Sequence, residues 1–287
     1  MRPTEFDYFS PGTLEEAVGL LKKYDDEAKV LAGGQSLLPL LKSRVTSIPY
    51  LVDIGNIYSL AYITRNDRSI LVGATTKVSS LENYSNFGKS LRILREAVKS
   101  IADPLIRNMG TVGGNIAHGD PGNDLPAVLM ALDGSVTVAG PAGSRHVSAR
   151  ELYIDSYTTV LKGNEIITEV QFPDWGSRSS GTYVKFKKPA GDFSVAALAI
   201  QIKLNRDGLC ERFGSAIASV GPTSIFLKDA SNVVVGTKIT PSIIEDASEA
   251  AAREISPTSD RNGTAEQKRD LVRKMFIEGA RKSLRKL

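Results

Sequence analysis

The stretch Ala32-Gly33-Gly34-Gln35-Ser36-Leu37-Leu38-Pro39 follows a short apolar run, and a second glycine pair stands in Thr111-Val112-Gly113-Gly114-Asn115-Ile116. Each pair lies where a predicted strand gives way to a turn or a short helix. In that geometry consecutive N–H groups can face one concavity and hold a phosphate. Glycine permits close approach because it has no side chain, and a positive φ costs it little. Both loops are candidate anion-binding sites, although either pair taken alone is more often a plain turn.

The spacing of the glycines disfavours two common classes of nucleotide-binding protein. Neither pair fits the G-x-G-x-x-G pattern of a nicotinamide-binding Rossmann domain. No Lys-Ser or Lys-Thr follows Gly33-Gly34 or Gly113-Gly114, as a P-loop would require. A Rossmann dehydrogenase and a nucleoside triphosphatase are therefore both poor interpretations.

Hydrophobic periodicity and turn residues predict alternating helices and strands around these loops. Helices are predicted at residues 13–24, 37–41, 91–101, 124–132, 241–254 and 264–285. Strands are predicted at residues 28–32, 50–54, 60–64, 69–74, 136–139, 146–148, 165–172, 194–204 and 209–220. Thr13 and Glu16 predict a capping box at the first helix. The Pro- and Gly-containing segment 173–181 is the best candidate linker, and Trp175 within it is predicted to pin two domains together.

Composition places the chain among globular proteins. It has 287 residues, 41% of them hydrophobic and 24% charged, with a net charge of +4. No apolar run approaches the roughly 18 to 20 residues of a membrane helix, so we expect no membrane insertion. The first residues lack the apolar core of a signal peptide, which favours a cytoplasmic location. The C-terminal basic residues lack an aromatic-interleaved groove, so nucleic acid is not an expected partner.

The supply of metal ligands and nucleophiles is small. Cys210 is the single cysteine, and His118 and His146 are the two histidines. A disulfide, a thiolate zinc site or an iron–sulfur cluster cannot be built from one cysteine, and we expect no metal site. We also expect no catalytic residue, because His118 has the position of an exposed loop histidine and Cys210 that of a small buried hydrophobe.

The two glycine motifs, with Asp120-Pro121 and Asp124-Leu125-Pro126 after the second, resemble the flavin-binding signatures of the FAD-binding medium subunit of molybdenum hydroxylases. The resemblance covers nearly the whole chain and extends to Asp103-Pro104-Leu105-Ile106-Arg107-Asn108, Phe186-Lys187 and Gly191-Asp192-Phe193. Within the xanthine dehydrogenase and carbon monoxide dehydrogenase family, separate subunits of this length are similar to medium chains of carbon monoxide dehydrogenase and of glyceraldehyde or other aldehyde oxidoreductases.

This resemblance implies an α+β fold with two domains. Residues 1–175 would form a two-lobed FAD-binding domain of the vanillyl-alcohol-oxidase type, also called PCMH-type. Residues 178–287 would form a small C-terminal α+β domain with an antiparallel sheet, typical of carbon monoxide dehydrogenase flavoprotein subunits.

The resemblance also implies a set of cofactor-binding positions. The first loop would lie along the FAD pyrophosphate, and the second would close on it from the other lobe. Asp124 matches a position at the adenosine end, Lys187 a cation beside the cofactor, and Phe193 an aromatic near the flavin ring. The complete set is Val30, Leu31, Ala32, Gly33, Gly34, Gln35, Ser36, Leu37, Ile101, Thr111, Val112, Gly113, Gly114, Asn115, Ala117, Asp120, Asp124, Leu161, Lys187 and Phe193.

The function implied by the resemblance is electron transfer. A large subunit would oxidise an aldehyde or a related substrate at a molybdenum cofactor, and a small subunit with two [2Fe–2S] clusters would pass the electrons on. Noncovalently bound FAD on a chain like this one would receive them and pass them to an external acceptor. Two copies of each chain would form a heterohexamer. Two alternatives stay open: a self-contained flavin reductase or oxidase of the same FAD fold, and a nucleotide-binding scaffold without a redox role.

Overall fold

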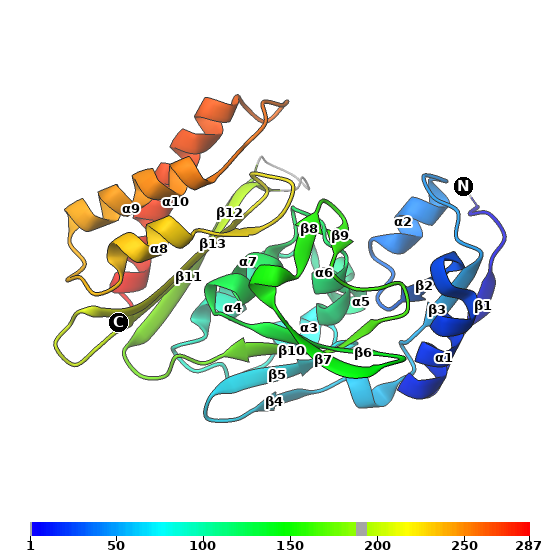
Figure 1. Ribbon diagram of the computed structural model, residues 1–287. Helices are drawn as coiled ribbons and strands as arrows, with labels where there is room; N and C mark the ends of the chain where they lie inside the picture. The colour runs from blue at the N-terminus through cyan, green and yellow to red at the C-terminus, as the bar shows by residue number, and fades with distance from the viewer. Residues whose placement is uncertain (1, 188–193) are drawn as a thin grey trace.

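The computed structural model describes residues 2–187 and 194–287, which form two lobes followed by a C-terminal sheet with helices (Figure 1). The first lobe, blue in Figure 1, has a parallel sheet in the order β1-β3-β2. Its elements are β1 (Asp7–Phe9), α1 (Leu14–Tyr24), β2 (Ala28–Leu31), α2 (Leu37–Lys42) and β3 (Tyr50–Asp53). Ala17 and Leu21 of α1 are fully buried in the core of this lobe.

The start of α1 confirms one half of the predicted capping box. The Thr13 hydroxyl accepts from the Glu16 N–H at 3.2 Å. The Glu16 carboxylate, however, accepts from the N–H of Gly12 at 3.0 Å and not from that of Thr13. The return bond is therefore shifted by one residue, and α1 is still held at its first turn from both sides.

The second lobe contains an antiparallel sheet in the order β4-β5-β10-β6-β7. Its strands are β4 (Ile63–Arg65), β5 (Ser69–Gly73), β6 (Ser135–Gly140), β7 (Gly143–Ser148) and β10 (Ile166–Pro173), with a hairpin of β8 (Tyr153–Asp155) and β9 (Thr158–Thr159). Its helices are α3 (Val78–Glu82), α4 (Arg92–Ser100), α5 (Pro104–Met109), α6 (Val112–Ala117) and α7 (Asp124–Ala131). The strand predicted at residues 60–64 begins only at Ile63, because Leu60 closes a 3-10 turn by bonding to the Ile57 carbonyl.

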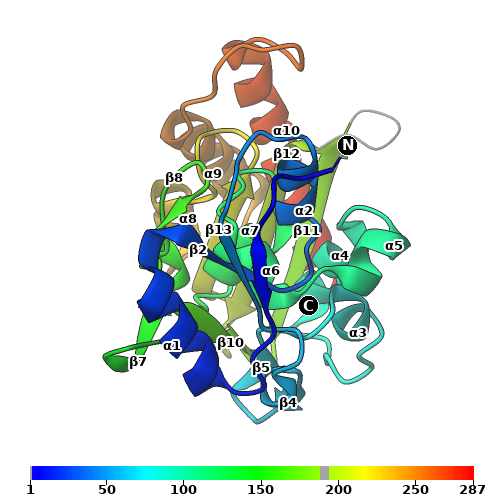
Figure 2. The same ribbon diagram turned by 90° about the vertical axis from the view of Figure 1, so that its right-hand side faces the viewer.

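The C-terminal part has an antiparallel sheet in the order β11-β12-β13-β14. Its elements are β11 (Ser179–Lys187), β12 (Ser194–Leu204), β13 (Cys210–Ala218), β14 (Ile225–Phe226), α8 (Lys228–Val234), α9 (Pro241–Glu254) and α10 (Ala265–Leu284). The views of Figures 1 and 2 place α8, α9 and α10 on the outer side of this sheet. Leu198 and Ile200 of β12 belong to the core beneath these helices.

The other face of the C-terminal sheet packs against the second lobe. Side chains alternate along a strand, and here Ala197 and Ala199 point toward the lobe that contains α4 and α7. Every residue of α7 is buried between the two sheets. The hydrophobic core of the second lobe therefore continues into the C-terminal sheet across residues 175–178. The division of the chain into two domains at that point stays a prediction.

Trp175 confirms its predicted role in joining the two parts. Its ring is 5% exposed, and its Nε1 donates to the Leu132 carbonyl at 3.0 Å. The Arg212 guanidinium of β13 lies 4.2 Å from the Trp175 ring centroid. In the described part of the chain, no helix is both long and apolar enough to cross a membrane.

Candidate functional site

The two glycine loops are in direct contact at Gly33. A Cβ added to Gly33 would lie 2.5 Å from the Met109 carbonyl oxygen and 2.7 Å from the Gly110 Cα. Both distances are below any normal contact, so the backbone of the first loop packs against the entrance of the second. The loops, far apart in the sequence, therefore form one continuous backbone surface between the two lobes.

The first loop offers a series of unpaired N–H groups. Gly34 has φ +71°, a left-handed conformation that favours glycine, and its carbonyl accepts from the Leu38 N–H at 3.1 Å. Gln35 and Ser36 are exposed at this turn. Within residues 2–187 and 194–287, no acceptor is bonded to the N–H of Gly34, Gln35 or Ser36. Three consecutive free donors at an exposed turn are suited to an anion such as a phosphate.

The second loop differs from the sequence-based expectation, because its N–H groups are already bonded. The N–H of Val112 donates to the Thr76 carbonyl and that of Gly113 to the Ala74 carbonyl, both at 2.9 Å. The N–H of Gly114 donates to the Thr111 hydroxyl at 3.1 Å. This loop therefore cannot hold a phosphate with these three donors as predicted. The N–H groups of Val112 and Gly113 instead bond this loop to the segment after β5.

Gly113 and Gly114 have different structural reasons to be glycine. A Cβ on Gly113 would lie 2.5 Å from the Ala74 Cβ, so this glycine allows α6 to pack on the segment after β5. A Cβ on Gly114 would meet only the Thr111 hydroxyl oxygen, at 2.7 Å, and Gly114 is exposed. Gly114 is thus the position at which a ligand can approach the backbone of the second loop.

Two buried polar atoms near the second loop lack a partner. The Asn115 side-chain Oδ1 accepts no hydrogen bond from any described residue, although its backbone carbonyl accepts from Asn123 Nδ2 at 2.8 Å. The Thr75 hydroxyl, next to the Ala74 carbonyl that bonds Gly113, is also unpaired among the described residues. An unpaired buried polar atom costs about 1–3 kcal/mol, so a water or a ligand atom bonded to either one would stabilise the structure. Sequence reasoning missed Thr75, because only the fold shows that its neighbours Ala74 and Thr76 bond the second loop.

Asp124 lies at the junction of the second lobe and the C-terminal sheet. Its side chain is 5% exposed, and its Oδ1 lies 2.8 Å from Lys185 Nζ of β11. The Tyr183 hydroxyl donates to the same carboxylate, and Lys185 also donates to the Ser100 carbonyl at 3.2 Å. Burial raises the pKa of Asp124, whereas the Lys185 ammonium opposes that rise. The carboxylate oxygens of Asp124 are thus bonded to Lys185 and Tyr183 of β11, and Asp124 joins the second lobe to the C-terminal sheet.

Lys187 lies two residues beyond Lys185 on the same strand and is exposed. Its charge, like that of Lys185, acts to lower the pKa of Asp124. Ile101 is buried, and its backbone carbonyl accepts from Arg107 at 2.8 Å. Phe193, predicted near the flavin ring, lies outside the described residues. The structure therefore brings Ile101, Asp124 and Lys187 to one region.

The remaining predicted positions surround the loops. Val30 and Ala32 are half-buried in the first lobe, whereas Ala117 and Leu161 pack at the margin of the core of the second. The Asp120 carboxylate accepts from the Gly122 N–H at 2.8 Å.

His118 differs from the expected exposed loop histidine. It is half-buried, and its ring centroid lies 5.3 Å from that of Tyr157. Burial lowers its pKa, while the charge of Asp120 opposes that effect. The ring packs on Tyr157, and the expectation that His118 is not catalytic stays a prediction.

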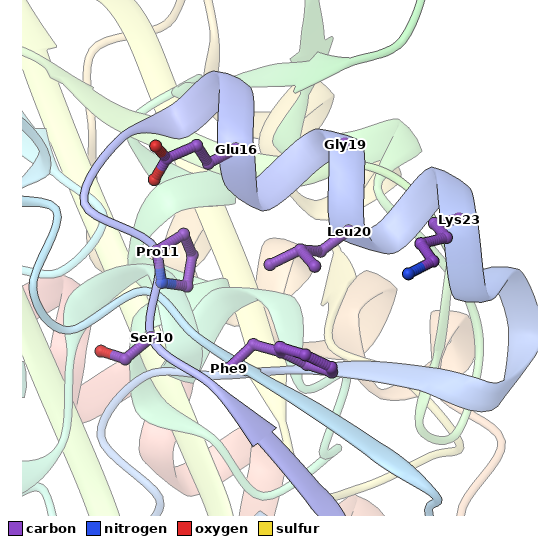
Figure 3. A pocket seen from close by; sticks show the side chains of 7 residues that line it. All are labelled: Phe9, Ser10, Pro11, Glu16, Gly19, Leu20 and Lys23. Atoms are coloured by element: carbon purple, nitrogen blue, oxygen red, sulfur yellow. The ribbon is translucent and has the colours of Figure 1, made fainter.

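A cavity of about 490 Å³ lies apart from the predicted site, beside α1 (Figure 3). Its charged groups are satisfied by neighbours, because Glu16 accepts from the Gly12 N–H and Lys23 donates to the Tyr24 hydroxyl at 3.0 Å. We therefore assign no ligand to it. Its lining residues are Phe9, Ser10, Pro11, Glu16, Gly19, Leu20 and Lys23.

Comparison with known proteins places both parts of the chain in described families. Residues 4–175 match the FAD binding domain in molybdopterin dehydrogenase, and residues 181–283 match the CO dehydrogenase flavoprotein C-terminal domain. The carbon monoxide dehydrogenase medium chain of Afipia carboxidovorans is 36% identical over 266 residues, covering 93% of this chain and 92% of that protein. The glyceraldehyde dehydrogenase medium chain of Sulfolobus acidocaldarius is 30% identical over 278 residues, covering 97% and 98%.

A solved structure agrees with these matches. The structure of carbon monoxide dehydrogenase from Hydrogenophaga pseudoflava superimposes with a TM-score of 0.96 at 34% identity, covering 100% of this chain and 99% of that one. The predicted fold class is confirmed: an α+β FAD-binding part of the PCMH type precedes a C-terminal part with an antiparallel sheet. The chain is therefore a member of the molybdenum hydroxylase family of FAD-binding medium subunits.

Proposed function

We propose that this chain binds FAD noncovalently between the two glycine loops and serves as the electron-transfer subunit of a molybdenum hydroxylase complex. The observation that carries the proposal is the contrast between the loops. The first loop has free N–H groups at Gly34, Gln35 and Ser36, and the second has an open backbone at Gly114 beside the unpaired Asn115 Oδ1. These groups suit a pyrophosphate flanked by polar ligand atoms.

The residues of the chain would bind and orient the cofactor. FAD, when bound, supplies the capacity to accept electrons and to release them. The N–H groups of the first loop would hold the pyrophosphate, and Asn115 Oδ1 would accept from a ligand donor. Lys187 would place a positive charge beside the cofactor, and the Asp124–Lys185 pair would keep β11 in position. We propose the full set of positions given under Sequence analysis as the cofactor site, with the domain boundary at 175–178.

Partners follow from what the sequence lacks. One cysteine cannot ligate a [2Fe–2S] cluster, so an electron donor of that kind must be another chain. We propose a small partner subunit with two such clusters and a large partner subunit with the molybdenum cofactor, in two copies each with this chain. The proposed substrate of the complex is an aldehyde or a related compound, since a relative at 30% identity is a glyceraldehyde dehydrogenase medium chain.

The relay is tested by mixing the purified chain with its two partner subunits and an aldehyde without oxygen. We expect the flavin absorbance to bleach in the mixture and to persist when the aldehyde is added to this chain alone. Rapid bleaching of the isolated chain by the aldehyde would contradict the relay and favour a self-contained flavoenzyme. A flavin that dithionite reduces, but that no substrate reduces through the partners, would favour a scaffold without a redox role.

A further inference from the structure

Arg107, on α5, is a nearly buried cation whose guanidinium donates hydrogen bonds to three acceptor atoms of other residues. Its side chain is 10% exposed, and its Nε donates to Glu82 Oε2 at 2.7 Å and its Nη2 to Glu82 Oε1 at 3.3 Å. Its Nη1 donates to the Ile101 carbonyl at 2.8 Å. A buried charge is costly unless it is paired and hydrogen-bonded. The guanidinium therefore fixes α3, α5 and the end of α4 in one arrangement.

The carbonyl that Arg107 holds belongs to a strained turn. Ile101 ends α4, and Ala102 follows with φ +39°, a conformation that residues with a side chain rarely adopt. Asp103 then caps α5 by accepting from the Ile106 N–H at 3.0 Å. Such strain persists only where the surroundings restrain the backbone from several sides, and Arg107 provides one of these restraints.

This turn contacts the predicted site at one end of α5, and Met109 contacts it at the other end. The carbonyl of Ser100 accepts from Lys185, which pairs with Asp124, so the turn lies between this ion pair and Arg107. At the other end of α5, the Met109 carbonyl packs against Gly33. A displacement of α5 would therefore move the turn and alter the contact between the two glycine loops.

We propose that Arg107 is a positioning residue for the bound flavin. Through Glu82 and the Ile101 carbonyl it fixes the turn at residues 100–103, and through α5 it sets the spacing of the two loops. This inference rests on the proposed function, because it requires FAD between those loops. Arginine suits this role better than lysine, since a planar guanidinium donates to two carboxylate oxygens and a carbonyl at once.

The test compares Arg107→Met, Arg107→Lys and Glu82→Gln in the full chain. The readouts are the dissociation constant for FAD and the visible circular dichroism of the bound flavin, which reports the asymmetry around the ring. We expect Arg107→Met to weaken FAD binding about tenfold or more and to change the dichroism band. Arg107→Lys should recover part of the affinity, and Glu82→Gln should shift both readouts in the same direction by less.

Arg65 provides a matched control in the same lobe. Its Nη2 lies 2.6 Å from Asp174 Oδ2, and its Nη1 donates to the Asn86 carbonyl, so it too joins a carboxylate and a backbone oxygen. We expect Arg65→Met to leave the flavin dichroism and the FAD affinity at the wild-type values, whatever its effect on stability.

Three outcomes would overturn the inference. The first is wild-type affinity and dichroism in Arg107→Met, and the second is an equal change in Arg65→Met, which would reveal a general loss of packing. If Arg107→Met does not fold, wild-type values in both Arg107→Lys and Glu82→Gln are the third. A wild-type chain that takes up no FAD would instead contradict the proposed function, so the two failures are distinguishable.

Discussion

Gly113 and Gly114 are neighbours in the sequence but meet different surroundings. Gly113 faces Ala74 at packing distance, whereas Gly114 faces open space apart from the Thr111 hydroxyl. A methyl group at the first position therefore disturbs the fold, and a side chain at the second disturbs the ligand. The sequence identifies both as glycines of one motif but does not separate these roles, because they depend on the segment after β5, which is distant in the sequence.

For this pair we expect opposite phenotypes. Gly113→Ala should destabilise the FAD-free chain by about 1–3 kcal/mol, since overpacking against a backbone segment is not easily relieved. Gly114→Asp should abolish FAD binding, because a carboxylate there adds charge repulsion to the steric block, while Gly114→Ala should weaken it only moderately. Urea unfolding and FAD titration measure the two effects. Equal FAD affinity in Gly114→Ala and Gly114→Asp would remove this loop from the site.

Asn115 offers a second test at the scale of one atom. Its Oδ1 makes no hydrogen bond with described residues, so Asn115→Ala should leave the FAD-free chain at least as stable as wild type. The same change should weaken FAD binding about tenfold, the value of one buried hydrogen bond. Asn123→Ala is the contrast, because it removes the bond to the Asn115 carbonyl and should lower stability. A fall in stability without a fall in affinity in Asn115→Ala would refute the assignment.

Among the elements, the long and strongly patterned ones were predicted, and so were the short strands β2 and β3, whereas the short helices α3, α5 and α6 were not. The helix at residues 241–254 and the hairpin around residues 205–208 agree with the prediction, because hydrophobic period and turn residues act locally. α5 and α6 have six residues each and begin at Asp103 and Thr111 caps. Helices of this length are held by tertiary contacts, which no local pattern reveals.

The pairing of α7 with β11 through Asp124 and Lys185 makes a prediction about elements. Asp124→Asn should destabilise the chain by about 3–5 kcal/mol, because it leaves the Lys185 ammonium nearly buried without its counter-ion. The double variant Asp124→Asn with Lys185→Met should recover much of that loss. Chemical unfolding of wild type, Asp124→Asn, Lys185→Met and the double variant gives the coupling energy between the two residues. Additive effects in the double variant would mean that the ion pair does not join these elements.

The thiol of Cys210, the first residue of β13, allows a prediction about its reactivity. It is 1% exposed, and burial raises the pKa of its thiol to about 12. The raised value means that the thiolate, the reactive form, is scarce in the folded chain at mildly alkaline pH. A thiol reagent such as Ellman's reagent should therefore react with the denatured chain and hardly with the native one. Rapid stoichiometric labelling of the native chain would contradict the burial of β13.

At the scale of the whole molecule, the C-terminal sheet is part of the core that supports the site. Ala199 of β12 and Ala216 of β13 belong to the same core as Ile116 and Val128 of the second lobe. The sequence indicated a linker at residues 173–181 because of its turn residues, but the connection covers only residues 174–178, since β10 ends at Pro173 and β11 begins at Ser179. Whether the core continues across this linker depends on which face of each strand packs inward. In alanine-rich strands the two faces differ little in hydrophobicity, so the sequence does not show which face is buried.

The same reasoning explains how much of the site the sequence predicted. The two loops were identified by their motifs, and the structure brings them into contact at Gly33. The free donors of the first loop and the engaged donors of the second were beyond sequence reasoning, because carbonyls of Ala74 and Thr76 decide which N–H groups remain free. Three-dimensional neighbours therefore determine the roles that two similar motifs take.

Titration of this chain with FAD tests most directly whether FAD binds at the two glycine loops. The chain is freed of bound flavin by acid and refolded, and Gly114→Asp is titrated beside it. We expect wild type to bind FAD stoichiometrically, to become yellow and to release unmodified FAD on heating, and Gly114→Asp to stay colourless although it still unfolds cooperatively in urea. A wild-type chain that takes up no FAD, or a Gly114→Asp chain that binds it equally well, would contradict the account.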